Sequence, residues 1–297
     1  MKKLYFGSNL KMYKGIQQTE DYLKELVKLT SDISRDEIEL FIIPSYTSLE
    51  RVGKTIDQKY VKLGAQNMCW EEQGQFTGEI SPLMLEEVGI KLVMIGHSER
   101  RHVFRETDED ESKKVRCGLD HGFTTLLCIG ETAEEKKYDL GPEVLRTQLK
   151  VGLSGVKKEE FTILLCIGET AEEKKYDLGP EVLRTQLKVG LSGVKKEDLG
   201  HVWVAYEPVW SIGVNGTPAT ADYAERMHKE IKNCLVELFG EEGREIPALY
   251  GGSVNPGNAE ELIVQPSIDG LFVGRAAWQA DKFNDLIHMA KKKYESQ

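Results

Sequence analysis

The stretch Leu92–Arg101, which reads LVMIGHSERR, contains the unit from which the whole fold is expected to be built. Its first half is apolar and ends in glycine, which is typical of a strand buried on both faces of a parallel sheet. Its second half is polar, and Ser98 and Glu99 favour the first turn of a helix. The stretch therefore predicts a buried strand that passes directly into a helix, with His97 at the junction.

The same alternation recurs along the chain. Amphipathic helical stretches such as Thr19–Leu29 and Ala221–Leu238 carry their apolar residues on one face. Eight strand–helix units predict an α/β fold of the (β/α)8 barrel type, with a doubly wound open sheet as the alternative. The predicted strands are Leu4–Leu10, Leu40–Pro44, Val61–Gln66, Leu92–Gly96, Thr124–Gly130, Val202–Tyr206, Ala248–Gly251 and Gly270–Gly274.

One of these units is present twice. The run LLCIGETAEEKKYDLGPEVLRTQLKVGLSGVKKE occupies residues 126–159 and occurs again, without a difference, at residues 164–197. No Pro/Ser-rich linker or charge block divides the chain, so residues 1–297 are expected to form a single domain. Because barrel closure ties strand number to tilt and shear, we expect eight strands, with Thr124–Gly130 and Thr162–Gly168 competing for one place.

Composition excludes several classes of protein. The formal net charge of -10 means that the surface as a whole repels nucleic acid and anionic membranes, so neither is an expected partner. The N-terminus does not read as a signal peptide, and no run approaches the length of about 18 apolar residues that spans a membrane. The five cysteines form no CxxC pair and the six histidines no HExxH motif, which predicts a cytosolic protein without a metal site.

Polar residues follow five of the predicted strands. The carboxyl ends of barrel strands meet at one face, so these residues are expected to converge there. Glycines among them would let backbone N–H groups approach a phosphate, which an acidic protein must bind with local donors. The residues are Asn9, Lys11, His97, Glu99, Glu207, Ser253, Gly274 and Arg275.

Three of these side chains have a chemical interpretation and a structural alternative. Glu207 lies beneath a loop with Gly213 and is a candidate general base, although a lone glutamate is more often a surface residue. His97 at a helix N-terminus would stay neutral and could polarise a carbonyl, whereas a lone histidine is more often part of the core. Lys11 would supply positive charge, whereas most lysines are merely solvated.

Six motifs, in order along the chain, together resemble the triosephosphate isomerase family. The resemblance covers essentially the whole chain apart from the duplicated unit, and it supports the barrel fold. The motifs are Asn9-Leu10-Lys11-Met12, Gly64-Ala65-Gln66-Asn67, Phe76-Thr77-Gly78-Glu79, Ile95-Gly96-His97-Ser98-Glu99-Arg100-Arg101, Ala205-Tyr206-Glu207-Pro208-Val209-Trp210 and Tyr250-Gly251-Gly252-Ser253-Val254.

The resemblance implies a role for each candidate residue. Glu207 would be the base that takes a proton from the carbon next to the carbonyl, and His97 the neutral electrophile that stabilises the enediolate, a pairing known for this family. Lys11 and Asn9 would contact the substrate, with Glu99 as a supporting charged group. No cofactor and no metal are implied. The phosphate would be held by the backbones at Gly213, Ser253, Gly274 and Arg275.

The implied activity is that of a glycolytic and gluconeogenic triose-phosphate isomerase, which interconverts dihydroxyacetone phosphate and glyceraldehyde 3-phosphate. The chain departs from the family where Leu10 stands in place of Trp, Tyr13 in place of Asn, and Arg275 in place of Gly. These departures resemble family members that isomerise a four-carbon erythrulose phosphate, which is the alternative function. A further alternative is an inactive phosphate-binding barrel disrupted by the duplication.

Two expectations concern assembly and substrate length. The segment Cys69–Ser81 sets aromatic residues among polar ones and is similar to the family's dimer loop, so a homodimer is expected. The alternative is a loop folded back on its own subunit. We expect substrate length to be read near Arg275 and Leu10, where a cation is gained and an indole lost.

Overall fold

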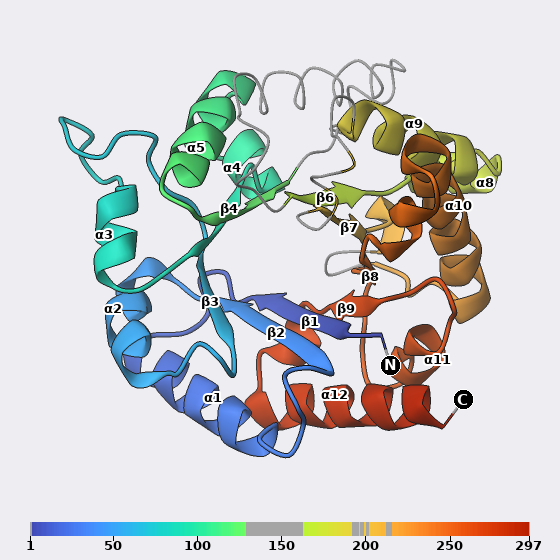
Figure 1. Ribbon diagram of the computed structural model, residues 1–297, viewed down its shortest axis with the longest axis horizontal. Helices are drawn as coiled ribbons and strands as arrows, with labels where there is room; N and C mark the ends of the chain where they lie inside the picture. Colours follow the sequence, from blue (N-terminus) through green and yellow to red (C-terminus); the bar gives the residue numbers. More distant parts are fainter. Residues whose placement is uncertain are drawn as a thin grey trace.

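The protein forms a parallel β-sheet with helices along its outer side (Figure 1). This computed structural model describes residues 2–128, 163–191, 196, 199, 202–211 and 216–296. The strands are β1 (Leu4–Asn9), β2 (Ile38–Ile43), β3 (Lys62–Ala65), β4 (Leu92–Ile95), β5 (Thr124–Leu127), β6 (Ile163–Ile167), β7 (Val202–Tyr206), β8 (Ala248–Tyr250) and β9 (Gly270–Phe272).

Helices follow most of the strands. They are α1 (Ile16–Leu29), α2 (Tyr46–Thr55), α3 (Pro82–Glu87), α4 (Ser98–His102), α5 (Asp108–Asp120), α8 (Ala171–Lys175), α9 (Gly179–Gly190), α10 (Ala221–Phe239), α11 (Ala259–Ile263) and α12 (Ala280–Glu295). Short 3-10 turns cover Val209–Ser211, Glu241–Glu245 and Arg275–Ala277. Among the described helices, none combines the length and apolar character that a bilayer crossing requires.

The sheet has the barrel architecture that the sequence predicts. Its strand order is β5-β4-β3-β2-β1-β9-β8-β7-β6, and every pairing is parallel. It curls so that its two end strands, β5 and β6, lie side by side, while the helices form an outer ring (Figure 1). The predicted strands and the two predicted helices are confirmed to within three residues at their described ends.

The strand count differs from the expected eight. Within the described residues the sheet has nine strands, because the first strand of each duplicated copy is paired. β5, from the first copy, pairs with β4, and β6, from the second, pairs with β7. The expectation that one copy is excluded from the sheet is therefore wrong. Each copy finds its own partner strand, so the two do not compete for the same ladder. Most of the first copy, residues 129–159, lies outside the described residues.

Alternate residues along each strand face two different hydrophobic layers. Phe41, Leu92, Met94 and Trp203 belong to one cluster, inside the curl of the sheet. Their strand neighbours, such as Val93, belong to the larger cluster that the helices cover. This period of two fills the barrel interior with side chains and leaves the strand ends to build a site.

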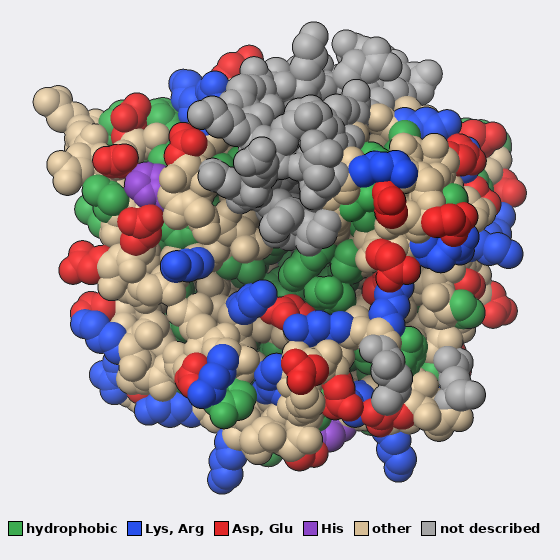
Figure 2. All heavy atoms as spheres, viewed as in Figure 1, with side chains coloured by type: hydrophobic (Ala, Val, Ile, Leu, Met, Phe, Trp, Pro, Cys, Tyr) green, Lys and Arg blue, Asp and Glu red, His purple; other side chains and the backbone are tan. Residues whose placement is uncertain are grey.

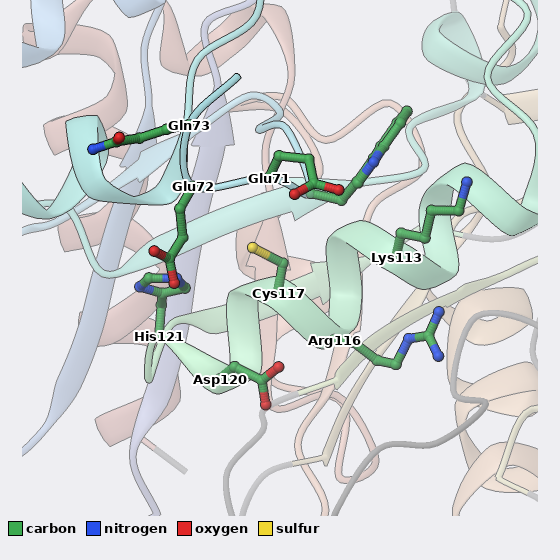
Figure 3. Close-up of a pocket in the computed structure, with 9 residues that line it drawn as sticks. Glu71, Glu72, Gln73, Lys113, Arg116, Cys117, Asp120 and His121 are labelled. Carbon is green, nitrogen blue, oxygen red and sulfur yellow. The ribbon is translucent and has the colours of Figure 1, made fainter. Parts of the chain in front are cut away.

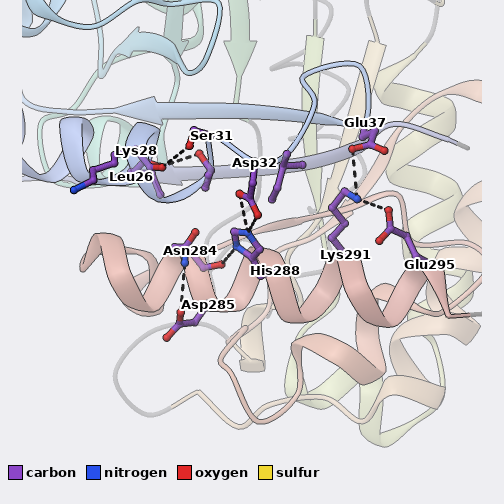
Figure 4. A network of polar contacts seen from close by, with 12 residues as sticks. Leu26, Lys28, Ser31, Asp32, Glu37, Asn284, Asp285, His288, Lys291 and Glu295 are labelled. Carbon is purple, nitrogen blue, oxygen red and sulfur yellow. Dashed lines mark hydrogen bonds and ion pairs between the residues drawn. The ribbon is translucent and has the colours of Figure 1, made fainter.

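The two ends of the chain meet where α1 packs against α12 (Figure 4). One ring nitrogen of His288 lies 3.0 Å from a carboxylate oxygen of Asp32, and the other lies 3.0 Å from the carbonyl oxygen of Asn284. The hydrogen bond from His288 lowers the pKa of Asp32. Lys291 adds an ion pair to Glu37 at 3.4 Å. These contacts hold the last helix against the first, next to the pairing of β1 with β9.

Candidate active site

The turn after β1 holds Lys11 in an unusual backbone conformation. Lys11 has a φ of 50°, in the left-handed region that few non-glycine residues adopt. The side-chain oxygen of Asn9 accepts the Lys11 N–H at 2.8 Å, and Gln66 donates to the Lys11 carbonyl at 2.8 Å and to Asn9 at 3.2 Å. The strained turn is therefore supported from the end of β3. The Lys11 ammonium lies 2.8 Å from a carboxylate oxygen of Glu99.

His97 lies between β4 and α4, as its sequence context predicts. It is the N-cap residue of α4, and its Nδ1 accepts the backbone N–H of Glu99 at 3.2 Å. An Nδ1 that accepts a hydrogen bond leaves the proton of the neutral imidazole on Nε2. Burial and the nearby charge of Lys11 lower the pKa of His97, and Glu99 opposes this shift. The ring is therefore a neutral donor at physiological pH.

Glu207 follows β7 directly. Its backbone N–H donates to the carbonyl of Ile167 at 2.7 Å, which places the residue at the end of the paired strands. Its side chain passes close to Gly251, where an added Cβ would lie 2.7 Å from Glu207 Cγ. Burial raises the pKa of Glu207 to about 7, and the charge of Lys11 acts in the opposite direction. A carboxylate with this pKa is well suited to accept and return protons near neutral pH.

Lys11 links these groups into one electrostatic unit. Its charge affects the pKa of His97, of Glu99 and of Glu207. Lys11, His97 and Glu207 follow the ends of β1, β4 and β7, which are far apart in sequence. A base, a neutral donor and a fixed cation in one place can move a proton and stabilise the negative charge that forms on an oxygen.

The structure describes three of the four expected phosphate-binding residues: Ser253, Gly274 and Arg275. Ser253, with a φ of 43°, follows β8 and donates from its hydroxyl to the carbonyl of Ser211, in the turn after Glu207. Gly274 is exposed, and an added Cβ there would meet nothing within 4 Å, so its backbone borders open space. Arg275 begins the turn that follows and is also exposed. Gly213 lies outside the described residues.

One sequence expectation at this site is wrong. Leu10 is 1% exposed and belongs to the core cluster between the sheet and the helices, so its side chain cannot contact a substrate. Leu10 continues the alternation of β1, because it lies on the same face of the chain as Leu4 and Phe6, which the helices cover. Gln66, the polar residue that ends the predicted strand Val61–Gln66, also belongs to this site, because it donates to Asn9 and to the Lys11 carbonyl.

A separate hollow lies between the loop after β3 and α5 (Figure 3). Glu72 from the loop and His121 from the end of the helix point toward one another, 3.5 Å apart, and Lys113 lies over the ring of Trp70. None of its lining residues is a candidate site residue. The base of the loop Cys69–Ser81 is thus anchored on its own subunit, while Phe76 remains 39% exposed.

In Figure 2 acidic and basic side chains are interspersed over the described part of the face seen there, without a broad basic patch. In the described ranges, no three His, Cys, Asp or Glu side chains gather as a metal-ligand set.

Comparison with known proteins agrees with this geometry. The family model described as triosephosphate isomerase matches residues 4–163 and 152–290. A protein of Rhizobium etli named L-erythrulose-1-phosphate isomerase is 41% identical over 96% of this chain and 91% of its own length. Proteins of the same name are 37% identical in Brucella abortus, over all of both chains, and in Mesorhizobium japonicum, over 98% of each. The chain belongs to the triosephosphate isomerase family.

Proposed function

We propose that this protein isomerises L-erythrulose 1-phosphate, a four-carbon ketose phosphate, by moving a proton between adjacent carbons. The observation that carries the choice of substrate is the name shared by its relatives, which are 37–41% identical over nearly the whole chain. The tetrulose alternative thus has better support than the triose phosphate that the family name suggests. The sequence of this chain supports the same choice of substrate, since Tyr13 and Arg275 depart from the common family pattern beside the candidate site.

The chemistry follows from three side chains. The Glu207 carboxylate removes a proton from the carbon next to the substrate carbonyl. As negative charge develops on the carbonyl oxygen, His97 Nε2–H donates a hydrogen bond to it and the Lys11 ammonium adds a positive charge. The hydroxyl proton on the deprotonated carbon then passes to the former carbonyl oxygen, and Glu207 returns its proton to the former carbonyl carbon, which completes the isomerisation. Glu99 holds the Lys11 ammonium at 2.8 Å and so fixes where that charge acts.

The phosphate is proposed to bind at the loops after β8 and β9, which carry Ser253 and Gly274. An added Cβ at Gly274 would meet nothing within 4 Å, which supports an accessible backbone there. Backbone N–H groups bind phosphate without requiring a basic surface, which suits a chain with a net charge of -10. Arg275 would add a side-chain cation next to this backbone.

Exchange with solvent tests the proposed reaction. The enzyme is incubated with L-erythrulose 1-phosphate in deuterium oxide, and the substrate and product are followed by NMR. We expect deuterium to enter the carbon that accepts the returned proton, because a carboxylate base exchanges its proton with solvent. Isomerisation without any deuterium uptake would favour a direct hydride shift, and the absence of any isomerisation would favour the inactive barrel.

The pH dependence of kcat/KM should report the ionisation of Glu207. Because its pKa is about 7 and the base must be deprotonated, kcat/KM should fall about tenfold per pH unit below that value and level off above it. The substrate phosphate also titrates near pH 6, so a control is needed. In Lys11→Met the loss of the cation should raise the pKa of Glu207, so the fall in kcat/KM should begin at a higher pH. A fall caused by the substrate phosphate would stay at the same pH. If kcat/KM fell only below pH 5 in both proteins, Glu207 would not be the base.

We expect the protein to be a homodimer. Large hydrophobic side chains are exposed after β1 and after α4, namely Met12 at 93% and Val103 at 67%, and we expect the loop carrying Phe76 to cover such residues on a second copy. Light scattering at micromolar concentration should give twice the mass of one chain, and Phe76→Glu should lower it toward one. A monomer mass for the unmodified protein would refute the dimer.

Arg275 is expected to contribute to substrate choice. Its cation stands where most of the family relies on backbone donors, so Arg275→Gly should reduce the preference for the four-carbon substrate over dihydroxyacetone phosphate. The measurement is the ratio of the two kcat/KM values in each protein. An unchanged ratio would remove this residue from the account of specificity.

A further inference from the structure

The duplicated unit gives this chain two glutamates with identical surroundings in sequence, Glu131 and Glu169. Each follows the run LLCIG and precedes TAEEKK. We propose that only the second copy serves the reaction, through Glu169, which acts as a positioning residue for the segment around Glu207. Glu131 then has no part in catalysis. This inference rests on the proposed function for its kinetic test, but the contacts that carry it do not.

Glu169 is a buried carboxylate surrounded by donors from three aromatic side chains. It is 0% exposed. The Tyr206 hydroxyl lies 2.9 Å from each of its oxygens, the Trp210 indole N–H donates at 2.8 Å and the Tyr223 hydroxyl at 2.9 Å. A buried carboxylate is costly unless such donors compensate it, so the cluster fixes all four side chains together.

These contacts hold both sides of the candidate base. Tyr206 precedes Glu207 directly, and Trp210 lies three residues after it. The backbone adds two further links: Glu207 N–H donates to the carbonyl of Ile167 at 2.7 Å, and Val209 N–H donates to the carbonyl of Glu169 at 2.9 Å. The segment that carries Glu207 is thus fastened to the second copy on either side of the base.

Other residues of the second copy contribute to the same arrangement. Gly168 lies so close to Glu207 that an added Cβ would be 2.2 Å from the Glu207 carbonyl oxygen. Gln186 holds Gly168 in place by accepting its N–H at 2.9 Å and donating to its carbonyl at 3.2 Å. The ammonium of Lys174 lies 3.2 Å from the centre of the Trp210 ring, which adds a cation–π contact.

The donors around Glu169 cannot bind Glu131 at the same time. Each tyrosine hydroxyl and the indole have a single proton to donate, and in all three residues that proton is directed at Glu169. A second carboxylate at this position would find no donor and would repel the first. The arrangement therefore admits one copy at a time, and β6 of the second copy is the strand that pairs with β7.

The test compares four proteins: the unmodified chain, Glu169→Gln, Glu131→Gln and the double variant. The two single variants change the same residue in the same local sequence, so each controls for the other. We expect Glu169→Gln to lower kcat on L-erythrulose 1-phosphate at least tenfold with KM changed less than threefold, since the base is displaced but the phosphate site is intact. Glu131→Gln should stay within twofold of the unmodified protein, and the double variant should match Glu169→Gln.

Three results would overturn the proposal. A loss of kcat in Glu131→Gln equal to that in Glu169→Gln would mean that both copies serve the site. Unchanged activity in both single variants, with loss only in the double variant, would mean that the copies exchange places. Unchanged activity in all variants would mean that the cluster is only structural. If Glu169→Gln does not fold, Tyr223→Phe removes one donor and should lower kcat severalfold; unchanged kcat would again contradict the proposal.

A spectroscopic measurement separates this inference from the proposed function. The indole N–H of each of the four tryptophans gives one NMR signal in protein labelled with ¹⁵N-tryptophan, and Trp210→Phe identifies the one that belongs to Trp210. Glu169→Gln should shift that signal, whereas Glu131→Gln should leave it in place. If the signals behave in this way but the protein is inactive, the second copy still contacts Trp210 and the proposed isomerase function is refuted. A shift caused by Glu131→Gln would refute the choice of copy and leave the proposed function untouched.

Discussion

Glu207→Ala is expected to lower kcat about 10²–10⁴-fold, the range that a positioned general base contributes. The carboxylate has a pKa of about 7 and lies where the charge of Lys11 reaches it. A base acts mainly in the transition state, so KM should change little while kcat and kcat/KM fall together. Steady-state kinetics on L-erythrulose 1-phosphate with both proteins measure the effect.

Two control variants make this result specific. Glu50→Ala alters an exposed glutamate on α2 that pairs with Lys54 and should leave kcat unchanged. Glu207→Asp keeps the charge but draws it back by one methylene, and it should retain more activity than the alanine variant. Turnover near that of the unmodified enzyme in Glu207→Ala would end the assignment of this residue as the base.

Deletion of residues 126–163, which leaves one copy of the duplicated unit, is expected to raise the melting temperature. In the described residues β5 is paired only with β4 and β6 only with β7, so each leaves one edge without a ladder. A single strand that pairs on both sides would recover these hydrogen bonds and remove an apolar, β-prone segment that invites aggregation. Each kcal/mol recovered should raise the midpoint by roughly 2–4 °C.

The registers of the two end strands make this closure possible without a shift. Leu126 of β5 is opposite Met94, and its twin Leu164 is opposite Trp203. The next position behaves in the same way, with Leu127 opposite Ile95 and its twin opposite Val204. A single copy of this strand can therefore pair with β4 on one side and with β7 on the other. Calorimetry should show the higher midpoint, with activity at least retained, whereas a lower midpoint would mean that the second strand stabilises the sheet.

The same deletion does not reveal which copy serves the site. Because the two copies are identical, removing either one gives the same remaining sequence. Only substitutions that mark one copy, such as those at Glu169 and Glu131, can distinguish them.

Much of the fold was predictable because local patterns determine it. Continuous apolar runs such as Leu92–Ile95 are strands because both faces of this sheet are covered, and the polar residues that end them mark the site. The fate of the two copies was not predictable, since identical sequences carry no information on which neighbour each will pair with. The assumption of eight strands treated closure as obligatory, whereas the described sheet leaves β5 and β6 unjoined.

The candidate site shows the same division. His97 and Glu207 could be identified as candidates because each directly follows a predicted strand. The outward direction of Leu10 follows from the alternation of β1, whereas the left-handed turn at Lys11 depends on support from the side chains of Asn9 and Gln66. The role of Glu169 depends on donors that lie 37 to 54 residues away in sequence. Such tertiary contacts have no local pattern in the sequence.

The central claim is that Glu207, His97 and Lys11 isomerise a four-carbon ketose phosphate. The most direct measurement is kcat/KM of the purified protein on L-erythrulose 1-phosphate and on dihydroxyacetone phosphate under the same conditions. We expect the four-carbon substrate to be preferred by at least about tenfold, the lower end of what one additional substrate carbon contributes to selectivity. An equal or greater kcat/KM on dihydroxyacetone phosphate, or no turnover of either substrate, would contradict this account.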